Sequence, residues 1–216
     1  MESALHKIAP QGLEVIETMG FTPEDGFVRL AWHIDRMEAT CARLHFPFER
    51  GAVLMALGEA VDDVPARVRV SVVVDGSVQV QIGDMVPVDR WRVGISDVVL
   101  HSDDPWLSVK TTNRAVYDDA RVALTDLDEV LFLNERGEVC EGTITNVFAD
   151  LGDGLVTPST SSGCLPGVLR GEMLASRQAR EGVLRMDDLK RAKAVFVGNS
   201  LRGLIAVDLD VSARGH

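Results

Sequence analysis

Residues 67–74 are the most constraining stretch of this sequence, because they read Arg-Val-Arg-Val-Ser-Val-Val-Val. Alternation of polar and apolar residues gives way to a continuous β-branched run, which is typical of a buried strand. Asp75-Gly76 then predicts a tight hairpin turn, and residues 78–82 predict the returning strand. The chain must therefore build at least one antiparallel sheet.

The rest of the first hundred residues fits an α+β pattern. Ile34, Met37, Cys41 and Leu44 recur at steps of three and four, which predicts one helix with His33 and Arg36 on a different side. The other predicted elements are strands at 14–21, 27–30 and 91–100 and a helix at 48–61. We therefore predict a small N-terminal α/β domain at residues 1–100.

The second part of the chain begins after a polar stretch. Residues 101–108 contain turn-forming residues and a proline, so we expect an inter-domain connector there and a larger domain at residues 109–216. Predicted helices cover 114–128 and 167–182, the second with Pro166 at its entrance and Gly182 as its cap. Predicted strands cover 130–133, 139–149, 155–157, 194–197 and 204–207.

Composition excludes several classes of protein. The net charge of −11 and the pI of about 4.9 argue against nucleic acid as a partner, because phosphate binding needs a basic surface. Three scattered cysteines and five histidines give no zinc pattern, and an odd, low cysteine count fits a reducing compartment. The N-terminus lacks a signal-peptide form, and no apolar run is long enough to span a membrane. We expect a cytoplasmic protein without a metal or a membrane partner.

Lys110 is the only lysine between Lys7 and Lys190 in a chain that otherwise prefers arginine. Arginine supplies charge at a surface as well as lysine does, but only lysine can form a Schiff base. An isolated lysine therefore suggests that an amine was needed, although on composition alone a simple bias toward arginine is the better explanation.

Three further stretches suggest a ligand, and each also has a plain structural reading. Residues 163–167 lead into a predicted helix whose first amides, at Val168 and Leu169, form a site for a small anion, or simply a helix entry. Glu141 lies in a β-branched strand, either buried against a cationic partner or exposed at an edge. Asn199 and Ser200 follow a strand, where loop residues often contact ligands or simply form a turn. Neither a P-loop nor a dinucleotide-binding motif is present.

Taken together, these stretches resemble the fold-type IV pyridoxal-phosphate enzymes, the class IV family of branched-chain and D-amino acid aminotransferases and aminodeoxychorismate lyase. The motifs are Lys110, Glu-Gly-x-x-x-Asn-x-Phe at 141–148, Leu-Pro-Gly-Val-x-Arg at 165–170 and Gly-Asn-Ser at 198–200. His-x-x-Arg-Met at 33–37 and Ile-Glu-Thr at 16–18 extend the likeness toward the N-terminus. The resemblance implies an α+β protein of two domains, with the active site between them, that works as a homodimer.

The resemblance also implies a role for each matching residue. Lys110 would hold pyridoxal 5'-phosphate as a Schiff base and then act as the acid–base catalyst. Glu141 would pair with the pyridine nitrogen. The other cofactor contacts implied are Arg36, Asn146, the amides of Val168 and Leu169, and Asn199 or Ser200. For the substrate, we expect contacts from Thr143, Thr145 and Arg202, and secondarily from Arg69 or Arg114.

The sequence around the lysine favours one reaction within the family. Branched-chain aminotransferases place a tyrosine shortly after the lysine, whereas this chain has Lys-Thr-Thr-Asn-Arg, and Tyr117 lies further along. Lys-x-x-Asn-Arg and Ser-Leu-Arg-Gly at 200–203 resemble the lyase branch. The first hypothesis is thus a folate-pathway lyase converting 4-amino-4-deoxychorismate to 4-aminobenzoate and pyruvate. The alternatives are a class IV aminotransferase for branched-chain or D-amino acids and a non-catalytic cofactor-binding paralogue.

Overall fold

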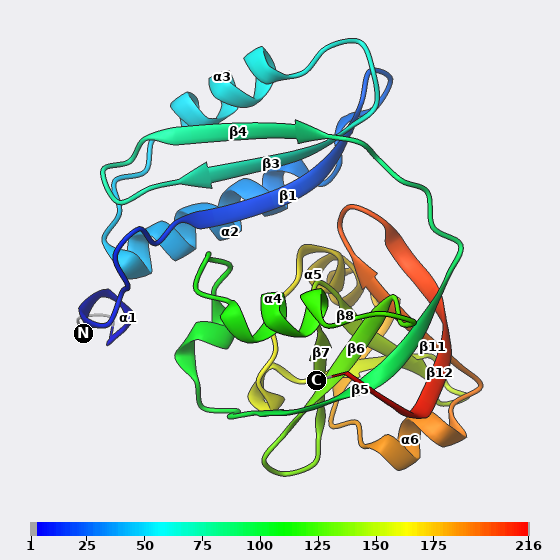
Figure 1. Ribbon diagram of the computed structural model, residues 1–216. Helices are drawn as coiled ribbons and strands as arrows, with labels where there is room; N and C mark the ends of the chain where they lie inside the picture. Colours follow the sequence, from blue (N-terminus) through cyan, green and yellow to red (C-terminus); the bar gives the residue numbers. More distant parts are fainter. Residues whose placement is uncertain (1–3, 216) are drawn as a thin grey trace. The chain divides into compact units, whose positions relative to one another are not determined.

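The computed structural model describes residues 4–215, and the chain divides into two compact units (Figure 1). Unit 1 comprises Met1–Val86 together with Val109–Asn113, and unit 2 comprises Pro87–Ser108 together with Arg114–His216. No helix among the described residues is both long enough and apolar enough to cross a membrane. Each unit has its own sheet.

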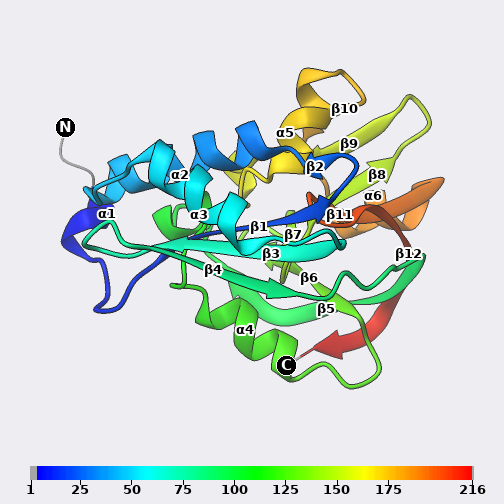
Figure 2. The same ribbon diagram turned by 90° about the horizontal axis from the view of Figure 1, so that it is seen from above.

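Unit 1 is a four-stranded antiparallel sheet with helices on one side, as Figure 2 shows for α2 and α3. The strand order is β2-β1-β3-β4. Its elements are α1 (Ala4–Lys7), β1 (Val15–Thr22), β2 (Gly26–Phe27), α2 (Leu30–Leu44), α3 (Arg50–Ala60), β3 (Ala66–Val72) and β4 (Val78–Gly83). The predicted hairpin of β3 and β4 is confirmed, with Val72 opposite Val78.

The two faces of this sheet differ in chemistry. Met19, Val68 and Val70 are buried on the face that carries the helices. The opposite face carries Thr18 and Gly20 of β1, paired with Arg69 and Arg67 of β3. Since side chains alternate along a strand, Gln79 and Gln81 of β4 complete this second face. We call Thr18, Arg67, Arg69, Gln79 and Gln81 the polar face.

The segment Val109–Asn113 belongs to unit 1 because it pairs with the start of β1. Thr111 forms an antiparallel bridge with Val15. The amide of Ile16 donates to the carbonyl of Lys110 at 3.0 Å, and the amide of Thr112 donates to the carbonyl of Glu14 at 3.0 Å. Val15 points toward the helices, so Thr111 does too. By alternation, Lys110 is directed to the same side as the polar face.

Unit 2 is built on a larger mixed sheet that closes into a ring. The order is β10-β9-β8-β11-β12-β5-β6-β7, and β7 also pairs with β8, so six strands form a barrel. The strands are β5 (Arg90–Leu100), β6 (Glu129–Asn134), β7 (Val139–Gly142), β8 (Asn146–Asp150), β9 (Leu155–Pro158), β10 (Ala179–Gly182), β11 (Ala194–Asn199) and β12 (Gly203–Gly215). The helices are η1 (Pro105–Ser108), α4 (Ala115–Val122), η2 (Thr160–Ser162), α5 (Val168–Ala175) and α6 (Met186–Arg191).

Three apolar clusters hold unit 2 together. The largest takes alternate residues from all six strands of the ring, among them Val93, Leu131, Val147, Val197 and Ile205. A second cluster lies under α4 and includes Phe132 and Tyr117, and a third lies under α5 around Phe148. Alternation along β6 and β8 thus sends one side chain into the ring and the next against a helix.

Several predicted elements have different bounds in the structure. The helix predicted at 114–128 ends at Val122, and Asp128 instead accepts the amide of Arg92 at 2.8 Å at the start of the β5–β6 pairing. The helix predicted at 167–182 ends at Ala175, because Arg177 adopts a left-handed φ of 59° and residues 179–182 form β10. The return strand at 27–30 stops at Phe27, and a left-handed Arg29 starts α2.

Two further predictions were wrong in ways that concern the site. The strand predicted at 139–149 is two strands, separated by a turn at residues 143–145. His33 was predicted to lie away from the apolar stripe of α2, yet it is 1% exposed.

The placement of β5 also differs from the sequence-based division of the chain. Sequence patterns put residues 91–100 in a first domain ending at residue 100, followed by a connector at 101–108. In the structure β5 pairs in parallel with β6 and β12, and the compact units divide between Val86 and Pro87. A strand carries little local information about which distant strand it joins.

Candidate functional site

Glu141 lies where the barrel of unit 2 closes. It is the penultimate residue of β7, and its pairing with Asn146 joins β7 to β8. Its side chain is buried, with Oε1 accepting from the Tyr117 hydroxyl at 2.7 Å and Oε2 from the Leu165 amide at 3.1 Å. Burial and the Glu141 carboxylate raise the pKa of Tyr117 well above its usual range, so the phenol stays a donor.

Asn146 and Glu141 together hold the segment that leads into α5. Nδ2 of Asn146 donates to the Leu165 carbonyl at 2.9 Å, while Glu141 accepts from the amide of the same residue. Gly167, the N-cap of α5, packs so closely on Asn146 that an added Cβ would collide with Oδ1. The amides of Val168 and Leu169 open the helix, where no carbonyl four residues earlier belongs to it. This helix start can receive an anion.

Asn199 organises the turn between β11 and β12. Its Nδ2 donates to the Ile144 carbonyl at 3.2 Å, and its Oδ1 accepts the amide of Arg202 at 3.0 Å. The turn presents Ser200, which is buried, and Arg202, whose guanidinium lies 5.6 Å from the ring centroid of Trp91. Asn199 and Ser200 were both predicted to bind phosphate. The side-chain amide of Asn199 instead makes hydrogen bonds that hold the turn.

Glu129 is a functional candidate that sequence reasoning missed. Its carboxylate is fully buried and accepts hydrogen bonds from the turn at 143–145 that links Glu141 to Asn146. The hydroxyls of Thr143 and Thr145, predicted to meet the substrate, both donate to Glu129, at 2.6 and 3.1 Å. Glu129 follows Asp126-Leu127-Asp128 in the sequence, a run that looks like a solvated acidic turn.

Arg36 is held by a buried carboxylate of unit 1. Its Nε and Nη2 donate to the two oxygens of Glu17 at 2.8 and 2.7 Å, and Nδ1 of His33 lies 2.6 Å from Oε2 of Glu17. Burial by itself raises the pKa of Glu17, but the Arg36 guanidinium and the His33 ring bring it down to about 2. Glu17 therefore stays ionised and fixes the direction of the guanidinium.

Lys110 shares one side of the unit 1 sheet with two arginines. Lys110 stands opposite Ile16, and Ile16 is paired with Ser71, two residues from Arg69. Two strand spacings and one two-residue step separate the Cα atoms of Lys110 and Arg69 by about 12 Å. Within residues 4–215, no carboxylate forms an ion pair with Arg67 or Arg69. An amine and two guanidinium groups therefore share one face.

The structure groups the predicted residues within each unit. Glu141, Asn146, Val168 and Leu169 gather around the backbone of Leu165. Thr143, Thr145 and Asn199 meet at the turn around Ile144. Arg36 and Lys110 belong to unit 1.

Two other features of unit 2 bear on the predicted site. Arg114, a secondary substrate candidate, donates instead to Asp118 at 2.9 Å and to the Thr143 carbonyl at 2.7 Å. A pocket of about 200 Å³ beside β5 and β12 is lined by Arg92, Leu124 and Leu127 and by none of the predicted site residues.

The residues of unit 2 fit pyridoxal phosphate on chemical grounds. Glu141 is a buried carboxylate that accepts hydrogen bonds from a phenol and an amide, and a buried carboxylate is a suitable partner for a protonated ring nitrogen. The start of α5 supplies amides for a phosphate. Both features are tied to Leu165, which keeps them in a fixed relation.

Comparisons with known proteins agree with this chemistry. The profile of the family described as Amino-transferase class IV matches residues 14–209. A protein of Schizosaccharomyces pombe, provisionally named an aminodeoxychorismate lyase, is 31% identical over 185 residues, 79% of each chain. The crystal structure of a provisionally named amino-acid aminotransferase from Mesorhizobium loti is 41% identical, with a TM-score of 0.88, and covers 92% of this chain and all of that one.

A more distant structure bears on the fold alone. The 4-amino-4-deoxychorismate lyase of Pseudomonas aeruginosa is 23% identical, with a TM-score of 0.77, over 94% of this chain and 85% of that one. The predicted α+β fold is thereby confirmed. Because the family profile covers most of the sequence, the chain belongs to the class IV aminotransferase family, whose enzymes use pyridoxal phosphate.

Proposed function

We propose that this enzyme converts 4-amino-4-deoxychorismate to 4-aminobenzoate and pyruvate. The observation that carries the proposal is the face shared by Lys110, Arg67 and Arg69 in a chain of net charge −11. In an otherwise acidic protein, two guanidinium groups lie on the same face of the sheet as an amine. Such a face suits a small substrate with an amine and carboxylates, and 4-amino-4-deoxychorismate carries one amine and two carboxylates.

Lys110 is the proposed acid–base group. When bound, the cofactor supplies a ring that accepts electrons from the carbon that bears the substrate nitrogen. Lys110 would take the proton from that carbon, the ether bond to the enolpyruvyl group would break, and a proton returned to the leaving group gives pyruvate. The remaining ring is then aromatic 4-aminobenzoate, and no external oxidant or amine acceptor is needed.

The other proposed roles are binding and orientation. Glu141 would accept a hydrogen bond from the protonated pyridine nitrogen. Arg36, Ser200 and the amides of Val168 and Leu169 would hold the phosphate. Arg69, supported by Arg67, would pair with a substrate carboxylate, and Arg202 with a second one.

Sequence likeness near Lys110 further supports the lyase assignment. Lys-x-x-Asn-Arg at 110–114 supports it, as does the 31% identity to the S. pombe protein over 79% of its length. The 41% identity to the M. loti protein favours the second candidate, an aminotransferase for an amino acid. Both reactions use the same cofactor contacts, so the substrate is what separates them.

One experiment distinguishes the two candidates. Purified protein with pyridoxal phosphate is mixed with enzymatically generated 4-amino-4-deoxychorismate, without any 2-oxo acid, and pyruvate is measured with a coupled dehydrogenase. A lyase releases pyruvate and leaves the cofactor as an aldehyde. An aminotransferase releases none but converts the cofactor to an amine when given an amino acid, which its absorbance reports. Lys110→Ala should abolish either activity, whereas a protein that only binds the cofactor would show neither.

The same proposal places the enzyme in folate synthesis, in the cytoplasm and as a homodimer. Membership of the class IV family supports these assignments. Sedimentation equilibrium of the protein with bound cofactor tests the dimer, since a mass of twice 23.5 kDa is expected.

A further inference from the structure

We infer that Glu129 is a positioning residue for the cofactor, acting through the turn at 143–145. The inference rests on the role proposed above for Glu141. The carboxylate lies at the first residue of β6 and is fully buried. Its oxygens face the hairpin loop between β7 and β8, residues 143–145, which begins two residues after Glu141 and ends one residue before Asn146.

The hydrogen bonds show that this loop is folded around the Glu129 carboxylate. Oε1 accepts the amide of Thr143 at 2.8 Å and its hydroxyl at 2.6 Å, and it also accepts the amide of Val130 at 3.1 Å. Oε2 accepts the amide of Ile144 at 3.2 Å and the hydroxyl of Thr145 at 3.1 Å. The loop therefore depends on Glu129 for partners that a β-hairpin alone does not provide.

Gly142 permits this approach. A Cβ at position 142 would lie 2.8 Å from Cδ of Glu129 and 2.9 Å from its Oε2, closer than atoms can pack. In the Glu-Gly pair of the sequence motif, Glu141 is thus the proposed partner of the pyridine nitrogen. Gly142 leaves the space that the Glu129 carboxylate occupies. Nη1 of Arg121 lies 3.9 Å from Oε1 and donates to the Thr143 hydroxyl at 3.1 Å, which places a cation beside the buried charge.

From this loop the connection to the cofactor site is short. At one end Glu141 and Asn146 hold the amide and carbonyl of Leu165, two residues before the N-cap of α5. At the tip of the loop, the Ile144 carbonyl accepts a hydrogen bond from the side-chain amide of Asn199, in the β11–β12 turn. Glu129 therefore anchors the loop to which both proposed phosphate-binding turns and the proposed pyridine partner are attached.

Glu129→Gln tests this inference without changing side-chain size. Each carboxylate oxygen accepts one loop amide, so the donor group of glutamine must face Thr143 or Ile144 in either orientation. We expect the dissociation constant for pyridoxal phosphate to rise at least about tenfold, because buried donors are left without partners. In the protein saturated with cofactor, we also expect the pH midpoint of the cofactor absorbance to move, since Glu141 is displaced.

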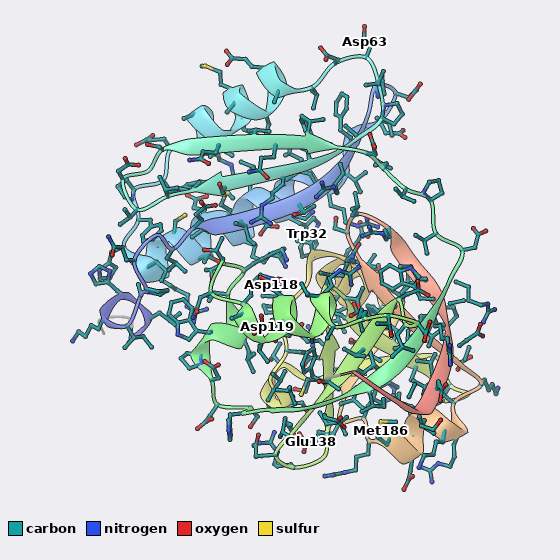
Figure 3. All side chains as sticks on the ribbon, in the orientation of Figure 1. Trp32, Asp63, Asp118, Asp119, Glu138 and Met186 are labelled. Atoms are coloured by element: carbon teal, nitrogen blue, oxygen red, sulfur yellow. The ribbon has the colours of Figure 1, made fainter. Side chains whose placement is uncertain are left out.

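Two further variants keep the test decisive if Glu129→Gln does not fold. Thr143→Val removes the hydroxyl and should weaken cofactor binding in the absence of any substrate, whereas Thr143→Ser should restore it. Glu138→Gln is the matched control, because Glu138 is also buried in unit 2 but pairs with Asn134, Arg136 and Ser162. Figure 3 shows Glu138 at the β6–β7 hairpin, far from α4, which carries Asp118.

The outcomes separate this inference from the proposed reaction. Unchanged cofactor affinity and absorbance in a folded Glu129→Gln or Thr143→Val protein would overturn the positioning role. If Thr143→Val raises only the KM of the substrate, the threonine contacts substrate and the inference also fails. Cofactor affinity and cofactor absorbance do not depend on whether the enzyme is a lyase or an aminotransferase.

Discussion

Glu17 provides a quantitative test of how unit 1 holds Arg36. The carboxylate is fully buried and accepts two hydrogen bonds from Arg36, and it also contacts His33. Burial raises the pKa of Glu17, and Arg36 together with the His33 ring more than reverses the effect, from 4.5 to about 2. That difference corresponds to about 3 kcal/mol of folding free energy.

The sign of the effect follows from the depressed pKa. Ionised Glu17 stabilises the folded state fully above pH 4.5, the unfolded value, and this contribution is lost as the pH falls toward about 2. Glutamine at this position carries no charge to titrate. The free energy of unfolding of Glu17→Gln should thus lie about 3 kcal/mol below that of the wild type at pH 7, and the gap should shrink to less than about half near pH 3.

Denaturant unfolding at pH 7, 5, 4 and 3, followed by circular dichroism, measures this gap. Glu38→Gln on α2, the helix that carries Arg36, is the control, because Glu38 pairs with Arg50 at the surface, with about half of each side chain exposed. An exposed pair of this kind contributes less than about 1 kcal/mol. The reasoning is refuted if the gap for Glu17→Gln stays constant from pH 7 to pH 3, or if it is no larger than that of Glu38→Gln.

Three further variants test the site. Tyr117→Phe removes the donor to Glu141 and should lower the free energy of unfolding by about 2 kcal/mol; a loss below about 0.5 kcal/mol in denaturant titration would show that the phenol is not bonded to the carboxylate. Gly167→Ala should weaken pyridoxal phosphate binding at least about tenfold in fluorescence titration, because the added Cβ displaces Asn146 from the start of α5. Arg69→Gln should raise the KM of a carboxylate substrate at least about tenfold with a smaller change in kcat, and an unchanged KM would remove the polar face from substrate binding.

Local patterns in the sequence predicted the elements whose causes are local. The valine run and Asp75-Gly76 predicted the β3–β4 hairpin, and the apolar spacing predicted α2. The extents of α4 and α5 were overestimated because their ends depend on other parts of the chain. The Asp128 carboxylate accepts a hydrogen bond from the amide of Arg92, and residues 179–182 pair with β9 as a strand. Neither segment can therefore stay helical.

The pairing between distant strands could not be predicted from the sequence. β5 looks like a continuation of the N-terminal antiparallel unit, but it joins two strands in parallel in unit 2. The roles of Glu129 and Glu17 were missed or understated for the same reason. Each is an acidic residue that accepts hydrogen bonds from residues 14 or more positions away, at the 143–145 turn or on α2, and only the fold reveals that it is a buried acceptor.

Within the motif at 141–146, some residues have a structural role and one has a proposed role in binding the cofactor. Of its six residues, Gly142 makes room for the Glu129 carboxylate, Thr143 and Thr145 donate to that carboxylate, and Asn146 holds Leu165. Glu141 is the residue proposed above to meet a ring nitrogen, and it also supports Leu165 with its second oxygen. A residue that recurs in a ligand-binding motif therefore need not touch the ligand. Here most of the motif builds the hairpin that fixes where one carboxylate points, so substitutions within it should first disturb cofactor binding and only then the chemistry.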